Sequence, residues 1–409
     1  MSIFDGFLST PQALTTFGGH NFVAAMLRFE AALARAQAAE GLIPASAAQS
    51  IVGTCQVELF DVDKIVRDSG HAGSVAIPLV RALKENVGLF NPEAVAFTHF
   101  GTTSQDMIDS ALVLVTREAI ALVEADLLVA IEALLAHAER HAATPMLART
   151  LMQPASVISF GFKCVGWAAP LVRARNRLRR AAHDALQLQL GGVVGSLAQM
   201  RAARGDATDV ALARAAAVRA RMAADLGLRD GGADWHSQRD EWVALGCELG
   251  LLTGSLGKIA TDIALLNQHE VGEVMEPVEQ GRGSSSVMVH KSNPVASMVA
   301  LAAAQRVPQR VAALLAAMAQ QHERALGAWQ AELAEWPQLV MAAHGSLRAL
   351  ARALPGLRVD PARMRANIDS VRAGLPPAAA EEWFGLGLAD GAGLLARERT
   401  ALLRAQLAA

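Results

Sequence analysis

Tyrosine is absent from this sequence of 409 residues, and aromatic residues make up only 4% of it. Strands favour aromatic and β-branched side chains, whereas alanine and leucine, which recur throughout this chain, favour helices. Charged residues are also scarce at 19%, against a usual share of about 25%. Hydrophobic residues reach 52%, which excludes long disordered segments. The composition therefore excludes an all-β fold and predicts an all-α protein with a sizeable core.

Several further absences exclude whole classes of protein. The formal net charge is −2 and no run of lysine or arginine occurs, so we expect no nucleic-acid partner. The N-terminal residues have neither the basic region nor the apolar run of a signal peptide, and no run of 18 uncharged apolar residues predicts a membrane span. The cysteines are far apart and odd in number, which favours reduced thiols and a cytoplasmic location: Cys55, Cys164 and Cys247.

Proline and glycine are missing from residues 105–142, where apolar residues recur at helical spacing. A helix of that length extends about 50 Å, far beyond the usual globular helix. Three similar segments follow, and two of them contain an internal proline. We expect a kink or an early helix start at Pro170 and a kink at Pro308. The segments are 155–190, 235–275 and 295–335. Long helices joined by polar loops predict a helix bundle.

Shorter elements are expected on either side of the long helices. Helices over 21–41 and 75–87, with a turn at 89–92, lie before them, and a tail richer in proline and glycine follows. We therefore divide the chain into a helical N-terminal domain (1–98), a central long-helix bundle (99–350) and a small helical C-terminal domain (351–409).

The first polar segment whose side chains could take part in catalysis or binding is 98–106, directly before the longest predicted helix. Thr102 with Gln105, or Thr103 with Asp106, could form the capping box of that helix. The same helix start could instead bind an anion through its free N–H groups, with His99 beside it. Local sequence leaves both interpretations open.

Two more polar segments adjoin long helices. Segment 148–156 offers hydrogen-bond donors from Arg149, Thr150 and Gln153, although an ordinary turn between helices is the default interpretation of this segment alone. Segment 281–294 has glycines and three serines and then reads His-Lys-Ser-Asn-Pro. Ser292 or Asn293 is a natural N-cap and Pro294 a natural first helical residue, so Lys291 and His290 stand beside a helix N-terminus, an arrangement suited to carboxylates.

In order and spacing, the three segments resemble the three signature regions of the fumarase/aspartase superfamily, over roughly residues 5–370. Within it the chain is most similar to the bacterial 3-carboxy-cis,cis-muconate cycloisomerases, through segments 69–83, 235–240, 256–277 and 322–332. Three positions depart from the family patterns. Pro154 stands where many lyases have a catalytic histidine, which counts against adenylosuccinate lyase. Val289 replaces a usual proline, and Ser292 replaces a frequent arginine.

The resemblance implies an all-α long-helix bundle and a cycloisomerase that converts 3-carboxy-cis,cis-muconate to 4-carboxymuconolactone in aromatic degradation. It implies a carbanion stabilised as an aci-carboxylate, with Ser285 as acid/base, Lys291 as the rival proton donor and His99 as a supporting catalytic candidate. The substrate-binding residues it suggests are Thr102, Thr103, Ser104, Arg149, Gln153, Ser286, His290, Asn293 and Arg324.

The resemblance also implies a homotetramer whose active sites are each built from three subunits. No metal-ligand spacing and no phosphate-binding glycine loop is present, so we expect no cofactor. Three alternatives remain: a cycloisomerase for a related muconate such as sulfomuconate, a lyase that releases fumarate, and a catalytically inactive helical interaction protein.

Overall fold

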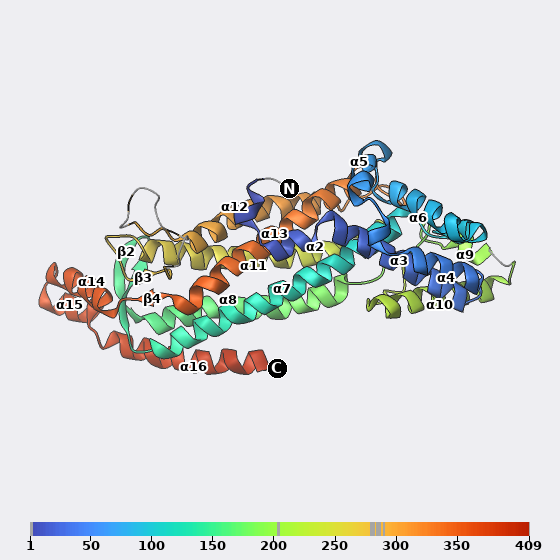
Figure 1. Ribbon diagram of the computed structural model, residues 1–409. Helices are drawn as coiled ribbons and strands as arrows, with labels where there is room; N and C mark the ends of the chain where they lie inside the picture. Colours follow the sequence, from blue (N-terminus) through green and yellow to red (C-terminus); the bar gives the residue numbers. More distant parts are fainter. Residues whose placement is uncertain (1–2, 203–204, 279–282, 284–287, 289–290, 409) are drawn as a thin grey trace.

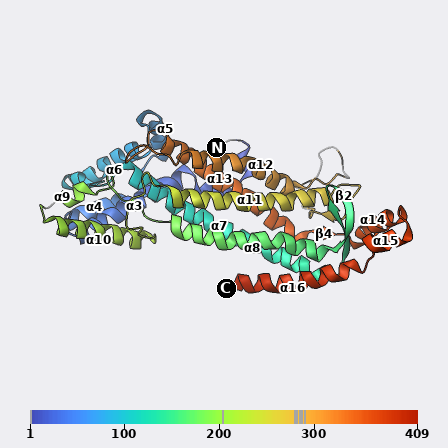
Figure 2. The same cartoon turned by 180° about the vertical axis from the view of Figure 1, so that it is seen from behind.

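The computed structural model describes residues 3–202, 205–278, 283, 288 and 291–408. The chain forms an elongated helical molecule in which long helices run side by side, as Figures 1 and 2 show from opposite sides. These helices are α7 (Ser104–Arg140), α8 (Phe160–Ala185), α11 (Asp240–Leu266), α12 (Val295–Ala316) and α13 (Ala328–Ala353). The predicted all-α bundle is confirmed.

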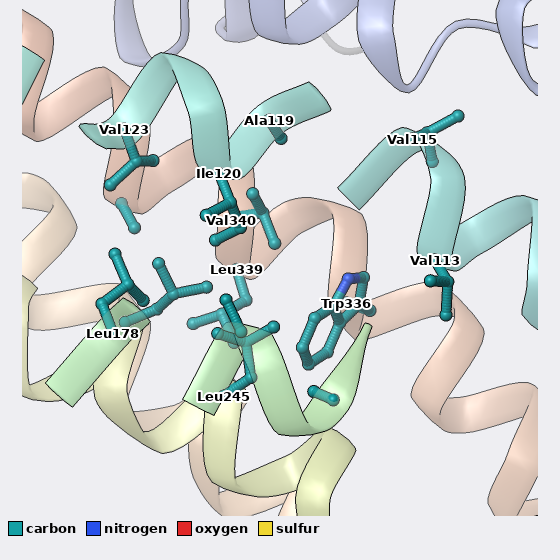
Figure 3. Close-up of a cluster of buried hydrophobic side chains, with 14 of the residues drawn as sticks. Val113, Val115, Ala119, Ile120, Val123, Leu178, Leu245, Trp336, Leu339 and Val340 are labelled. Carbon is teal, nitrogen blue, oxygen red and sulfur yellow. The ribbon is translucent and has the colours of Figure 1, made fainter. Parts of the chain in front are cut away.

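Helix α7 is the central element, and its start and end agree with the predicted segment within two residues. Its first turns, up to Thr116, are buried on every side, whereas from Arg117 onward one side of the helix is exposed, for example at Glu118 and Val129. In Figure 3 its apolar side chains meet those of α8, α11 and α13 around Trp336. The Trp336 indole N–H donates to the Thr116 hydroxyl (2.8 Å), and its ring stacks on Trp242 with centroids 3.9 Å apart. These contacts fix how the long helices pack.

The expected helix over 155–190 begins only at Phe160, because its first residues form a strand. β1 (Pro145–Thr150) and β2 (Gln153–Ser159) pair as an antiparallel hairpin. The hairpin turns at Leu151 and Met152, whose φ angles of 50° and 67° lie in the left-handed region that glycine or asparagine usually supplies. The sequence carried no turn signal there, so the prediction of helix over 155–159 was wrong. Pro170 lies inside α8, as expected.

Two other predicted long helices were too long. Segment 295–335 is divided into α12 and α13, which lie against each other and are joined by residues 317–327; Gly327 has a φ of 92° that helices do not allow. Within 235–275 only α11 is helical, and the segment ends in strand β3 (Val274–Met275), which pairs with β4 (Arg358–Val359). Pro308 lies inside α12.

Most of the shorter helices lie at the two ends of the bundle (Figure 1). Two of the shorter helices, α1 (Asp5–Leu8) and α2 (Pro11–Thr16), lie instead along the bundle, α1 against α12 and α13 and α2 against α7 and α13. At one end are α3 (Gly19–Ala39), α4 (Ala45–Thr54), η1 (Val57–Leu59), α5 (Val62–Ala72), α6 (Ala76–Phe90), η2 (Pro92–Phe97), α9 (Ala198–Ala202) and α10 (Thr208–Leu226). At the other are η3 (Leu354–Gly356), α14 (Pro361–Ala373), α15 (Pro377–Phe384) and α16 (Leu388–Ala408). Helix α10 follows α8 in sequence but packs on α3, and α16 returns along α8.

Helix α11 is the one described helix that is long and apolar enough to cross a membrane by length and composition. Half of its most apolar window is buried inside the chain, against α8, α12 and α13. It is therefore part of the core of the bundle.

Candidate active site

The first predicted segment lies at the start of α7, with Thr103 as the N-cap. The Asp106 carboxylate accepts hydrogen bonds from the Thr103 backbone N–H (3.1 Å) and from the Thr102 hydroxyl (3.0 Å). Of the two capping arrangements left open, the pair Thr103 and Asp106 is the one present. The Gln105 side chain donates instead to the His236 carbonyl (2.9 Å), so the pairing of Thr102 with Gln105 does not form. The helix start is thus held from within by Asp106.

Arg324 meets this helix start from the other side. It lies in the connection between α12 and α13, and its guanidinium donates a hydrogen bond to the Thr103 hydroxyl. Arg324 is only half-buried, and a guanidinium has five N–H donors, so it keeps donors for a carboxylate. The Thr103 hydroxyl accepts from Arg324 and can direct its own proton to an anion. Two predicted substrate-binding residues, 221 positions apart in sequence, therefore lie together.

Asp106 also joins the start of α7 to two distant loops. Its carboxylate accepts from the backbone N–H groups of Gly191 (2.9 Å) and Gly192 (2.8 Å) and pairs with His236 Nε2 at 2.8 Å. Burial lowers the pKa of His236, but hydrogen bonds and the charges of Asp106 and Asp234 outweigh burial and raise the pKa to about 9. A buried imidazolium thus faces Asp106. A Cβ at Gly191 would lie 2.9 Å from the His236 ring, so only glycine fits there.

His99 precedes the same helix and is held in a left-handed conformation, with φ of 62°. Its Nδ1 lies 2.5 Å from a carboxylate oxygen of Glu30, which is almost fully buried. Burial lowers the pKa of His99, yet the charge and hydrogen bond of Glu30 more than offset this, and the pKa is raised. Because Glu30 engages Nδ1, Nε2 is the ring nitrogen left for a ligand. His99 and Ser104 line one cavity of about 460 Å³.

A buried charged cluster beneath this site was not predicted. The Arg239 guanidinium, fully buried, donates to Asp109 (2.7 Å) and to Glu332 (3.1 Å), and the Trp329 indole N–H donates to Asp109 (2.9 Å). Asp109 is on α7, Arg239 precedes α11, and the other two residues are on the first turns of α13. The cluster therefore fixes the start of α13 and the adjoining connection that carries Arg324. Charged residues inside apolar helical segments were the signal available in the sequence.

The second predicted segment is the β1–β2 hairpin, at the far end of α7. The Arg149 guanidinium donates to both carboxylate oxygens of the buried Glu273, at 2.7 and 3.0 Å. Glu273 also accepts from the Asn367 side chain (2.8 Å). Arg149 thus ties the hairpin to the C-terminal helices, and the described contacts give it an internal partner in place of a substrate carboxylate. Gln153 begins β2 and is exposed.

The third predicted segment is described in part. The predicted residues Ser285, Ser286 and His290 lie outside the described residues. Lys291 and Asn293 are described and exposed, directly before α12. The Asn293 backbone N–H donates to the Gly283 carbonyl (2.8 Å).

The start of α12 is not the free anion site that the sequence suggested. The Glu276 carboxylate accepts from the N–H groups of Ala296 and Ser297 and from the Ser297 hydroxyl, each at 2.8 Å. The Val295 N–H donates to the Asn293 carbonyl (2.9 Å). An internal carboxylate therefore occupies the position that an anion would take at this helix end. The backbone N–H groups of Ala296 and Ser297 are therefore already bonded and are not free to bind a substrate anion.

The predicted site residues form two groups at opposite ends of the bundle. His99, Thr103 and Arg324 lie at the start of α7, and the hairpin follows its other end (Figures 1 and 2). At a rise of about 1.5 Å per residue, the 37 residues of α7 separate the ends by about 55 Å. One chain therefore does not bring the two groups together.

Neither a metal-ligand group nor a reactive cysteine thiol is present among the described residues. No group of three or more histidine, cysteine, aspartate or glutamate residues is placed to hold a metal ion within the described ranges. The thiols of Cys55, Cys164 and Cys247 are unpaired, and burial raises the pKa of each. Raised pKa values keep these thiols protonated and poorly nucleophilic.

Comparison with known proteins identifies the family of this chain. A family model described as a lyase matches residues 10–308. The chain is 45% identical over 345 residues to the 3-carboxy-cis,cis-muconate cycloisomerase of Bradyrhizobium diazoefficiens, covering 84% of this chain and 74% of that protein. It is 44% identical over 366 residues to the enzyme of that name from Pseudomonas aeruginosa, covering 90% of this chain and 77% of that protein.

A solved structure extends the likeness to the fold. The crystal structure of the 3-carboxy-cis,cis-muconate lactonizing enzyme from Pseudomonas putida is 38% identical, with a TM-score of 0.82 and coverage of 99% of this chain and 90% of that one. The match extends over both ends of the bundle and the helices between them. The chain belongs to the lyase family of the fumarase/aspartase superfamily.

Proposed function

We propose that this chain is a 3-carboxy-cis,cis-muconate cycloisomerase, which closes its substrate to 4-carboxymuconolactone. The observation that carries the proposal is the meeting of Arg324 with Thr103 at the start of α7, beside His99. This end of the bundle offers a cation, hydroxyl groups and an imidazole, which together suit a carboxylate-rich substrate. The names of the relatives supply the reaction.

The reaction is an intramolecular addition that loses no atoms. An oxygen of one carboxylate bonds to an alkene carbon, and the electron pair of that double bond moves toward the neighbouring carbon and its carboxylate. The resulting aci-carboxylate then takes one proton at carbon. The chain must stabilise the growing negative charge with donors already in place and must supply the proton. We assign charge stabilisation to Arg324 and Thr103 at one end, and to Lys291 and Asn293 at the other.

Two residues are candidates for the group that donates the proton to carbon. Ser285 is favoured by its place in the family signature, and Lys291 is the alternative. A hydroxyl needs nearby cations to act as an acid or base at carbon, and Lys291 would supply one. His99, whose raised pKa comes from Glu30, would support binding or proton transfer at the other end.

Because the two groups of site residues are separated within one chain, a complete site requires more than one subunit. We propose a homotetramer in which the start of α7 from one subunit meets the hairpin and the start of α12 from two others, so that three subunits form each site. Antiparallel packing of copies would bring opposite bundle ends together, which a distance of about 55 Å prevents within one chain. Exposed apolar side chains on the long helices, Val129, Leu251, Met298 and Leu315, support this packing.

Absorbance spectroscopy tests the reaction. The conjugated diene of 3-carboxy-cis,cis-muconate absorbs in the ultraviolet and the lactone lacks that conjugation, so absorbance should fall when protein is added with a chelator. A rapid, chelator-resistant loss supports the proposal. An unchanged spectrum would contradict it, and the sulfonated analogue and fumarate release from succinyl compounds would then be assayed.

Co-expression tests the shared site. R324M and K291M should each be nearly inactive alone, because each removes a cation from every site. Co-expressed at equal levels, the two variants should form mixed tetramers in which about a quarter of the sites have both cations, restoring about a quarter of the activity. Two R324M chains carrying different affinity tags are the control. No restoration in mixed tetramers isolated by both tags would show that both cations act within one subunit.

The compartment follows from the thiols. Three unpaired cysteines suit a reducing environment, so we place the enzyme in the cytoplasm.

A further inference from the structure

A cavity of about 460 Å³ lies beside the start of α7, within the usual size range of small-molecule sites. His99 and Ser104 form part of its wall, and the rest comes from one face of α6. That face follows helical spacing: Ala76, Ile77, Val80, Arg81, Lys84 and Glu85. Residues three and four positions apart thus direct both apolar and charged side chains toward the same space.

Two of the lining side chains are cations that form no ion pair within the described part of the chain. Neither Arg81 nor Lys84 forms an ion pair with another described residue, and both are exposed. Glu85 also lines the cavity and is not paired to either cation. His99 is already matched with Glu30 by the contact of 2.5 Å. The lining therefore keeps two cations against one anion, and its charge favours an anionic ligand.

The cavity adjoins the proposed reaction centre through the chain itself. Ser104, in its wall, follows Thr103, the hydroxyl of which binds Arg324. A ligand held by Arg324 and Thr103 can therefore extend past Ser104 toward α6. Its hydrocarbon part would meet Ile77 and Val80, and a distal carboxylate would meet the two cations.

We propose that Arg81 and Lys84 bind the third carboxylate of the substrate and select a tricarboxylate over the corresponding dicarboxylate. This inference rests on the proposed function for the identity of the substrate. It assigns a specificity role to α6, beyond the three signature segments. Arginine can hold the carboxylate with two hydrogen bonds and lysine adds a point charge. Glu85 repels any anion in the cavity, so binding there needs both cations.

Direct binding tests the subsite without turnover. Tricarballylate is glutarate with one added carboxyl group on its central carbon, so the pair isolates the third carboxylate. Isothermal titration of the purified assembly should give tighter binding of tricarballylate. The R81Q/K84Q double variant should weaken tricarballylate at least about tenfold and glutarate less than about twofold.

Two further variants separate a specific subsite from general charge. R81K/K84R keeps both cations and should retain most of the preference for tricarballylate. R67Q removes an exposed cation from α5, outside the cavity, and should leave both affinities unchanged. Equal weakening of both ligands in R81Q/K84Q, or no weakening of either, would overturn the proposal.

Kinetics distinguishes failure of the subsite from failure of the proposed function. If the wild-type chain lactonises 3-carboxy-cis,cis-muconate, R81Q/K84Q should raise KM about tenfold with little change in kcat, since the variant loses uniform binding. If the wild type lacks that activity, the proposed function fails, while the preference for tricarballylate still decides the subsite. An unchanged KM in R81Q/K84Q would contradict the subsite alone.

Discussion

His236 and Asp106 form a buried ion pair, with His236 Nε2 2.8 Å from an oxygen of the carboxylate. The pair connects the loop before α11 to the first turn of α7, where the same carboxylate holds the Thr102 hydroxyl. The start of α7 is therefore fixed by a residue 130 positions away in sequence. The position of Thr103, and with it the contact to Arg324, depends on this pair.

The raised pKa of His236 predicts how stability varies with pH. The unfolded imidazole has a pKa near 6.5 and the folded one about 9, so stabilisation by the proton is complete below about 6.5 and is lost as pH rises through 9. A shift of this size corresponds to roughly 3 kcal/mol. Urea unfolding at pH 6, 7.5 and 9.5 should show the decline, and H236Q should flatten it. A decline of equal size in H236Q would assign the effect to other groups.

The contact between Arg324 and Thr103 predicts different losses for two substitutions. R324M removes a cation that binds carboxylate, and we expect kcat/KM to fall about a hundredfold or more. T103V removes only a hydroxyl and should cost about tenfold. Because Arg324 is half-buried, R324M should change the unfolding free energy by less than about 1 kcal/mol. T103V also removes the N-cap hydroxyl of α7 and should lower the unfolding free energy by about 1 kcal/mol.

A double-mutant cycle checks that these residues act together. The R324M/T103V variant should lose less than the product of the two single losses, since either change breaks the same contact. Strict multiplication of the two effects would show that each residue binds substrate independently.

The buried cluster around Arg239 predicts a large loss of stability. R239M leaves Asp109 and Glu332 facing each other without a cation, and removal of one partner from a buried ion pair costs about 3–5 kcal/mol. Urea denaturation measures the change. The D109N/R239M/E332Q variant removes all three charges and should recover much of the loss. If it remains as unstable as R239M, the hydrogen bonds of the cluster matter more than its charges.

Sequence reasoning found what depends on neighbouring residues. Absence of proline and glycine located α7, and two candidate capping pairs marked its start, of which Thr103 with Asp106 is the one present. It failed where distant residues decide the structure. Leu151 and Met152 turn the hairpin although neither residue type favours a left-handed conformation, so the pattern there gave no sign of strands.

The same limit applies to the site. The segments that carry the family signatures were located, but their partners were not. Glu273 satisfies Arg149, and Glu276 fills the start of α12, and no local pattern pairs these acids with those positions. Lys84 belongs to a helix that was predicted, yet only the packing of α6 beside Ser104 turns it toward a cavity. A side chain's role there depends on tertiary position, which one sequence does not specify.

The contact of Glu276 with the start of α12 predicts that an external anion can replace the Glu276 carboxylate when that carboxylate is removed. E276A exposes the N–H groups of Ala296 and Ser297 and should lower the unfolding free energy by about 1–2 kcal/mol. Those N–H groups then form the kind of helix terminus that binds sulfate. Sulfate should therefore raise the Tm of E276A more than that of the wild type. E276Q, which keeps an oxygen acceptor without the charge, should fall between the two. Equal responses to sulfate in all three proteins would mean that Glu276 acts only by packing.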